Sequence, residues 1–202
     1  MLYQTSEGSY GFRFQDNSQA NVASIYIIGH ENRTLLDYHW DGMTRDDGPS
    51  YIFQYTLSGK GIIEVGEERY TLSTGHVFIV KVPSEHRYYL PKGSPHWEFI
   101  YITLKGKEAI TCWEYIQHNF GTVMTIPREA PVIQLLFTLY CETKNGEISD
   151  SFIASLKAYE FIIACYRYFK NITKLNEEIP DYIKKSGPLY ENALQSAKNF
   201  FR

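Results

Sequence analysis

The pattern of hydrophobic and polar positions changes near residue 105. Before that point, short segments rich in Ile, Val, Tyr, Phe and Thr alternate with Gly, Pro, Ser and Asp residues typical of turns. The pattern predicts strands at residues 24–28, 35–40, 51–57, 61–65, 69–72, 77–82, 86–90 and 97–104. The connections are too short for the crossover helices that parallel strands require, so we expect antiparallel strands. Such strands form a barrel or sandwich that can enclose side chains or one small ligand.

The second half of the chain has the period of helices. Apolar residues recur every three or four positions, which predicts helices over residues 111–120, 131–144 and about 150–170. Pro131 is favoured at the first position of a helix, and Ser149 or Asp150 can cap the start of the third helix. The fold class we expect is α+β, with an antiparallel barrel followed by helices.

The third helix is apolar on two sides. One set recurs at the spacing found in helix pairs: Phe152, Leu156, Tyr159, Ile163 and Tyr166. A second set widens the apolar surface: Phe161, Ile162, Cys165 and Phe169. A helix with two apolar sides can pack on its own barrel and on a partner, so we expect dimerisation through the first set. The alternative is that both sides are buried within one chain.

The last part of the chain turns polar. Residues 171–187 include Pro180 and Ser186-Gly187, and we expect them to form a linker. Pro188 then begins a further amphipathic helix, which reaches Arg202 without a capping residue. Because a domain seldom ends on an unfinished apolar face, we expect the chain to be truncated there.

The composition suits one globular unit and gives no sign of nucleic-acid binding. Of the 202 residues, 44% are hydrophobic and 21% charged, and the net charge of −3 does not attract a phosphate backbone. The N-terminus lacks an export signal, and no apolar run is long enough to span a bilayer. Cys112, Cys141 and Cys165 are too scattered for a disulfide framework. We expect free thiols and a cytoplasmic protein.

Motifs for catalysis and metal binding are lacking in the sequence. An open metal site needs three or four convergent ligands. The strand at 51–57 contains no histidine and no carboxylate, which leaves His86 as a single candidate ligand. No Gly-x-Ser-x-Gly motif, phosphate-binding loop or Gly-x-Gly-x-x-Gly motif occurs. We therefore expect a protein that is not an enzyme and holds no metal or other cofactor.

Aromatic residues with polar tips are abundant in the predicted strands. The chain has 17 Tyr, 12 Phe and 3 Trp residues. Strand alternation places two sets of three on single faces: Tyr51, Phe53 and Tyr55 in one strand, and Trp97, Phe99 and Tyr101 in another. Such rings and hydroxyls suit a small polar ligand such as a sugar. The alternative is an aromatic core without a ligand.

Four motifs in order along the barrel match a known family. They are Arg45, a turn and an aromatic strand ending in Gly-x-Gly at 45–61, a Gly turn at 70–75, Pro and His-x-Tyr at 83–88, and Trp with a terminal Gly at 97–106. The pattern resembles the sensor domain of AraC-type transcriptional regulators over about residues 20–106, and the helices to about residue 170 agree with that plan. This resemblance implies a cupin-like barrel (a jelly roll) that binds a small effector, commonly a sugar.

The resemblance also implies a division of the chain. An arm would span residues 1–20, the ligand-binding barrel 21–106, a helical dimerisation segment 107–170 and a linker 171–187. Residues 188–202 would begin a helix-turn-helix domain whose remainder is absent. The partners implied are a small-molecule effector, a second copy of the chain, and DNA only through the missing domain. The arm would close over the ligand or signal to the DNA-binding part.

Site residues are carried over position by position from the resemblance. Arg45 matches the family's ligand-binding arginine, and Tyr88 matches the tyrosine of the His-x-Tyr step. The expected ligand site is completed by Tyr55, His86, Trp97, Phe99 and Tyr101. Two rivals remain open: a stand-alone cupin enzyme, such as a metal-dependent sugar isomerase or a dioxygenase, and a storage or scaffold module with a filled barrel.

Overall fold

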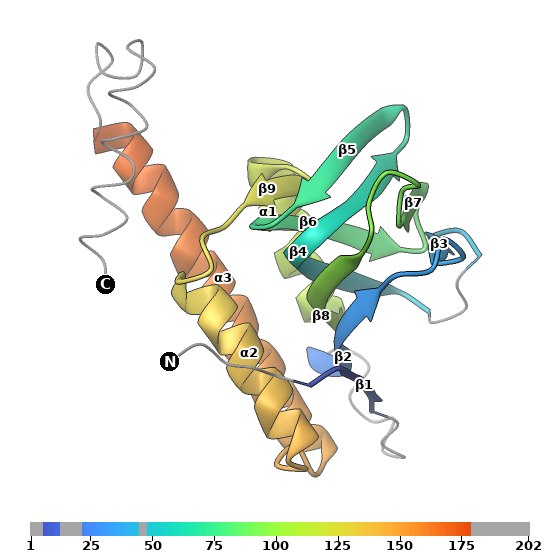
Figure 1. Cartoon of the computed structure of the whole chain (residues 1–202). Coiled ribbons are helices and arrows are strands. Elements are labelled where there is room, and N and C mark those ends of the chain that lie inside the picture. Colours follow the sequence, from blue (N-terminus) through green and yellow to red (C-terminus); the bar gives the residue numbers. More distant parts are fainter. Residues whose placement is uncertain (1–5, 13–21, 45–47, 179–202) are drawn as a thin grey trace.

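The computed structural model describes residues 6–12, 22–44 and 48–178, which form a β-sandwich flanked by helices (Figure 1). The strands are β1 (Gly8–Gly11), β2 (Ser24–Arg33), β3 (His39–Asp41), β4 (Ser50–Val65), β5 (Glu68–Ser73), β6 (His76–Val82), β7 (His86–Tyr89), β8 (Trp97–Lys105) and β9 (Val123–Thr125). The helices are α1 (Lys107–Phe120), α2 (Pro131–Lys144) and α3 (Ser151–Glu178). The antiparallel α+β fold predicted from the sequence is confirmed.

A single long strand, β4, belongs to both sheets of the sandwich. Its first half pairs with β6 and β8, in a sheet ordered β1-β2-β8-β4-β6-β9, and its second half pairs with β5 and β7. The change occurs at a register shift between Thr56 and Ser58, next to Gly59, whose φ of 71° favours glycine. The sequence pattern predicted two strands, 51–57 and 61–65, separated by a turn at Ser58-Gly59. That turn is wrong, because these residues bend one continuous strand and do not reverse it.

Strand β2 is longer than the sequence pattern predicts. It continues through the polar segment Gly29–Arg33 because β8 supplies a partner for every residue there, from Gly29 opposite Tyr101 to Arg33 opposite Trp97. The strand predicted at 35–40 is mostly a turn, and pairing with β7 begins only at His39. Pairing with a neighbouring strand thus overrides the polar composition of the segment.

The two faces of the first sheet enter two different cores. Phe53 points toward the helices, where its ring centroid lies 5.8 Å from that of Trp113 on α1 and 5.2 Å from that of Phe161 on α3. Tyr51 and Tyr55 share this helix-facing core. Ile52, on the other face of β4, belongs to the core between the two sheets. Burial of each large apolar side chain stabilises the fold by about 1.5–3 kcal/mol.

The helices cover the outer face of the first sheet. Helices α2 and α3 lie side by side on that face, and β3 and β7 lie on the side of the sandwich away from them (Figure 1). Pro131 begins α2 as predicted, and the Asp150 carboxylate caps α3 by accepting hydrogen bonds from the Phe152 and Ile153 amides at 2.9 Å. Within the described part of the chain, no helix is long and apolar enough to cross a bilayer.

Helix α3 does not end where the polar composition begins. It runs to Glu178, eight residues past the predicted end at Lys170 and into the predicted linker. Lys174, Glu177 and Glu178 are good helix formers, so polarity alone does not mark the end of the helix. The rest of the predicted linker and the predicted terminal helix at 188–202 lie outside the described residues, as do residues 1–5 and 13–20 of the predicted arm.

Candidate functional site

A cavity of about 340 Å³ opens between the two sheets. Its lining comes from strands that are far apart in the sequence: Ser9 on β1, Ile27, Glu31 and Arg33 on β2, Tyr38 and Trp40 at β3, Ile52 and Gln54 on β4, Tyr88 on β7, and Tyr101 and Thr103 on β8. This volume lies at the lower end of the range for small-molecule sites. The sandwich therefore has room for one small ligand.

A chain of hydrogen bonds crosses one wall of the cavity. The Tyr101 hydroxyl donates to Glu31 Oε1 at 3.0 Å. A phenol has one proton to donate, so the Ser9 hydroxyl donates to Tyr101 in the 2.7 Å contact between these oxygens. Glu31 Oε2 accepts from Arg33 Nε at 2.8 Å and from Nη2 at 2.6 Å. Burial and the Glu31 carboxylate raise the pKa of Tyr101, which keeps its hydroxyl protonated at neutral pH.

Aromatic rings form another part of the wall. The Arg33 guanidinium lies over the Tyr38 ring, 4.9 Å from its centroid. The Tyr38 ring packs in turn on Trp97 and Phe99, with centroids 6.0 and 5.7 Å apart. Burial raises the pKa of Tyr38 well above its ordinary value, so this hydroxyl also stays protonated. The wall therefore offers ring faces together with phenol donors.

Gly29 provides the space for the Tyr101 ring. The two residues are opposite each other in the pairing of β2 with β8. A Cβ atom at position 29 would lie 2.6 Å from the nearest Tyr101 ring carbon, closer than real Cβ atoms approach. The glycine thus lets the ring lie flat across β2, with its hydroxyl beside Glu31.

The cavity contains part of the expected ligand site. Tyr88 and Tyr101 line it. Trp97 and Phe99 are fully buried behind it in the core between the sheets, where they support Tyr38. Arg45 lies outside the described residues.

Two expected site residues lie elsewhere. Tyr55 is a correction to the expected site, because it faces the helices with Phe53 on the side of β4 opposite the cavity. Strand alternation required Tyr55 to share a face with Phe53, and Phe53 is covered by α1 and α3. His86 lines a separate, second cavity.

Sequence reasoning missed five polar residues that line the cavity: Ser9, Glu31, Arg33, Gln54 and Thr103. Glu31 and Arg33 were missed because β2 was expected to end at Ile28. Gln54 carried a usable signal, since it is the polar position in an otherwise aromatic and aliphatic strand and alternates with Phe53 and Tyr55. Ser9 could be found only from the structure, because β1 reaches the cavity by pairing with β2.

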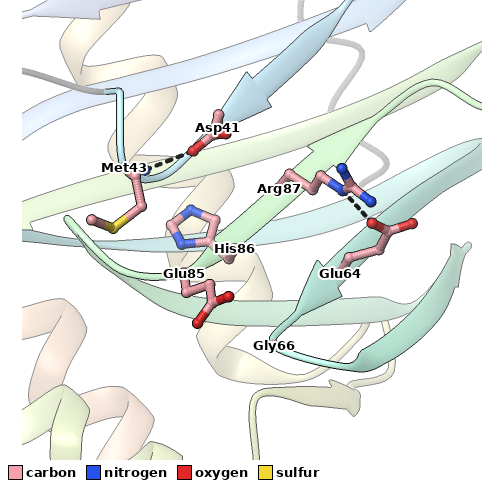
Figure 2. A pocket seen from close by; sticks show the side chains of 7 residues that line it. All are labelled: Asp41, Met43, Glu64, Gly66, Glu85, His86 and Arg87. Atoms are coloured by element: carbon pink, nitrogen blue, oxygen red, sulfur yellow. Dashed lines mark hydrogen bonds and ion pairs between the residues drawn. The ribbon is translucent and has the colours of Figure 1, made fainter.

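The second cavity, also of about 340 Å³, lies around β7 and the end of β4 (Figure 2). It is lined by Asp41, Met43, Glu64, Gly66, Glu85, His86 and Arg87. Arg87 donates to Glu64, and Tyr89 donates to the other Glu64 oxygen at 2.8 Å. These bonds lower the pKa of Glu64. Across the described residues, no three His, Cys, Asp or Glu side chains are placed to hold a metal ion.

A polar cluster outside both cavities joins β2, β4 and β8. Glu98 accepts hydrogen bonds from His30 Nε2 at 2.9 Å and from the Ser58 hydroxyl at 2.7 Å. Ser58 also contacts His96 Nε2 at 3.0 Å. The cluster holds the bent part of β4 against its neighbours.

Acid should destabilise the chain partly through Glu98. Burial raises the pKa of this carboxyl, but hydrogen bonds from Ser58 and His30 outweigh burial and hold the pKa below its ordinary value of 4.5. The stabilisation is therefore present above pH 4.5 and is lost as the pH falls through the lower, folded-state pKa. We expect Glu98→Gln to lose less stability than wild type between about pH 5 and about pH 3 in urea denaturation. Equal losses in the two proteins would contradict this assignment.

Comparisons with known proteins found similar solved structures, each with a TM-score below 0.5. Among solved structures, the AraC-like transcriptional activator CuxR is 9% identical over 68% of this chain and 46% of its own (TM-score 0.46). ToxT from Vibrio cholerae is 14% identical over 57% and 47% (TM-score 0.39). YhaK from Escherichia coli is 12% identical over 50% and 45% (TM-score 0.38). The chain thus spans less than half the length of each.

The family is established by sequence, since these structural scores are too low to assign it. No curated protein matches the chain at a significant level. The family model described as the AraC-like ligand binding domain matches residues 27–162, which is more than half of the 202 residues and includes most of both sheets and all of α1 and α2. The chain therefore belongs to the family of AraC-like ligand-binding domains.

Proposed function

We propose that the chain is the non-enzymatic, cytoplasmic sensor of an AraC-like regulator and binds a small uncharged polar compound, such as a sugar. The cavity between the sheets carries this proposal, because its wall combines hydroxyl, carboxylate and amide groups with aromatic ring faces. Arg33 is already paired with Glu31, so the wall has balanced charge and favours a neutral ligand over an anion. The hydroxyls of a sugar can form hydrogen bonds with the polar groups of the wall, and its C–H surfaces can pack on the aromatic rings.

The arm strand β1 supplies a route from the cavity to the helices. Ser9 contacts Tyr101 in the cavity wall. Three residues earlier, the Ser6 carbonyl accepts a hydrogen bond from the Tyr140 hydroxyl of α2 at 2.7 Å. The Tyr10 and Tyr140 rings pack edge to face, with centroids 5.8 Å apart. A ligand that competes for Tyr101 would change the affinity of the arm for the sheet, a coupling typically worth about 1–3 kcal/mol.

An exposed apolar stripe on α3 supports the homodimer that belongs to this proposal. Phe152, Leu156 and Ile163 remain 66%, 66% and 61% exposed. Tyr166 continues the stripe and packs at a tilt on Tyr115 of α1, with ring centroids 5.4 Å apart. The opposite side of α3 is buried against the sheet and α1, so within the described part of the chain the stripe remains exposed and could meet a second copy. Contacts to DNA would come from another part of the regulator.

Ligand titration tests the proposed function. We expect one or more neutral monosaccharides to raise the melting temperature of the wild-type chain in a concentration-dependent way. Arg45→Ala should lower the affinity for the same ligand about 10- to 100-fold, which is the usual effect of losing a hydrogen bond from a charged group. Calorimetric titration measures both dissociation constants. Arg69→Ala, which removes an exposed arginine of β5, is the matched control and should bind as wild type does.

One result would revise the proposed site, and another would contradict the proposed function. Unchanged affinity in Arg45→Ala would remove this arginine from the site. A purified chain that retains a stoichiometric transition metal and turns over a sugar would favour the rival cupin enzyme.

A further inference from the structure

Gln54 is a buried polar residue on the floor of the cavity between the sheets. Its side chain is 2% exposed and lies among the residues that line the cavity. Among the described residues, its amide nitrogen Nε2 has no hydrogen-bond partner. Buried polar groups in folded proteins nearly always have a partner, so an amide left without one requires an explanation.

The neighbours of Gln54 in the sheet explain why its amide finds no partner inside the protein. Gln54 lies opposite Phe78 of β6 on one side and Tyr101 of β8 on the other. Phe78 has no polar atom in its side chain. The Tyr101 hydroxyl is engaged with Ser9 and Glu31. Because Gln54 lines the cavity, a ligand bound there is a candidate partner for its amide.

The position of Gln54 on β4 shows that a polar residue is not required there by the fold. Alternation along β4 directs Tyr51, Phe53 and Tyr55 to the helices, and Ile52 and Gln54 to the space between the sheets. Isoleucine, the residue at position 52 on the same face, would fill position 54 at a lower cost in folding free energy, because it would bury no unpaired donor. An unpaired donor is expected at such a position where a bound ligand supplies its acceptor.

We infer that Gln54 Nε2 donates a hydrogen bond to an acceptor oxygen of the bound ligand and selects ligands that carry an oxygen at that position. This inference rests on the proposed function, and it adds a recognition group. Glu31 is less deeply placed and can accept from ligand hydroxyls. A neutral polyhydroxy compound offers both an acceptor oxygen for Gln54 and hydroxyl donors for Glu31.

The substitution Gln54→Met tests the inference because methionine has nearly the same shape and no donor. Two effects of opposite sign are expected. The unliganded variant should melt about 2–6 °C higher than wild type, because an unpaired buried donor is removed. Its affinity for the tightest binder among D-glucose, D-galactose, D-mannose and D-xylose should fall about 10- to 100-fold.

Gln117 supplies a matched control. Its amide nitrogen donates to the Ile79 carbonyl and to the Thr122 hydroxyl, both at 3.1 Å. Gln117→Met breaks these bonds and should lower the melting temperature while leaving sugar affinity unchanged. A structural role for Gln54 would give the same result as Gln117→Met, so the sign of the melting shift separates the two roles.

Singly deoxygenated analogues of the bound sugar identify the oxygen that Gln54 contacts. One analogue should bind wild type at least tenfold more weakly than the parent sugar, yet bind Gln54→Met as well as the parent does. A lower or unchanged melting temperature in unliganded Gln54→Met overturns the role of Gln54, even if wild type binds a sugar. Absence of any sugar-induced shift in wild type overturns the proposed function and the inference with it.

Discussion

Gly61→Ala should lower the melting temperature of the chain by about 2–12 °C, an overpacking cost of about 1–3 kcal/mol in a domain of this size. A Cβ atom at position 61 would lie 2.2 Å from the Trp97 ring. That ring is fully buried between the sheets, 4.7 Å from Phe99 and 6.0 Å from Tyr38 by centroid distance. Its Nε1 donates to the Thr56 hydroxyl at 3.2 Å. The ring cannot move aside without losing these contacts.

Gly93→Ala is the matched control for this prediction. Position 93 lies in a turn, its φ is not positive, and a Cβ atom there would meet nothing within 4 Å. This variant should melt within about 1–2 °C of wild type, as surface substitutions usually do. Differential scanning calorimetry measures both shifts. If Gly61→Ala melted at the same temperature as Gly93→Ala, the core of the sandwich would have adapted around Trp97, and the prediction would be wrong.

The double substitution Leu156→Glu with Ile163→Glu should convert the proposed dimer into monomers. Both side chains lie in the exposed apolar stripe of α3, and burying four carboxylates in a symmetric interface is strongly unfavourable. Because neither side chain belongs to a core, the fold should persist, and the far-ultraviolet circular dichroism should stay as in wild type. We expect the dissociation constant of the dimer to rise at least 100-fold. Sedimentation velocity over a range of concentrations measures it.

Leu35 and Leu36 provide a control with the same change in charge. They are 68% and 55% exposed and lie in the turn between β2 and β3, away from α3. Leu35→Glu with Leu36→Glu should leave the dimer intact. A dimer that persists in the α3 variant, or one that dissociates in this control, would move the interface away from the stripe.

The residues that line the cavity between the sheets could be predicted only in part from the sequence. The motifs that resemble AraC-type sensors led to Tyr88 and Tyr101, and both line the cavity. Glu31 was not found, because a polar segment after Ile28 looks like the end of a strand until β8 is known to pair with it. Tyr55 was placed on the wrong side, because alternation shows which residues share a face and does not show which face a helix will cover.

Local sequence signals were sufficient to predict much of the secondary structure. The helical period after residue 105 predicted three helices, Pro131 marked the start of α2, and Asp150 capped α3. The short connections between strands required antiparallel pairing. These features depend on the conformational preferences of a few adjacent residues, so the sequence alone is sufficient to predict them.

Only the tertiary structure decided how these elements enclose a cavity. Ser58 and Gly59 have the composition of a turn, yet β4 passes through them as one strand because β5 and β6 pair with its two halves. The same packing places Phe53 under the helices and turns Gln54 toward the cavity. Strand partners and covering helices come from distant parts of the sequence, and the free energy of their contacts outweighs the local preference at each position.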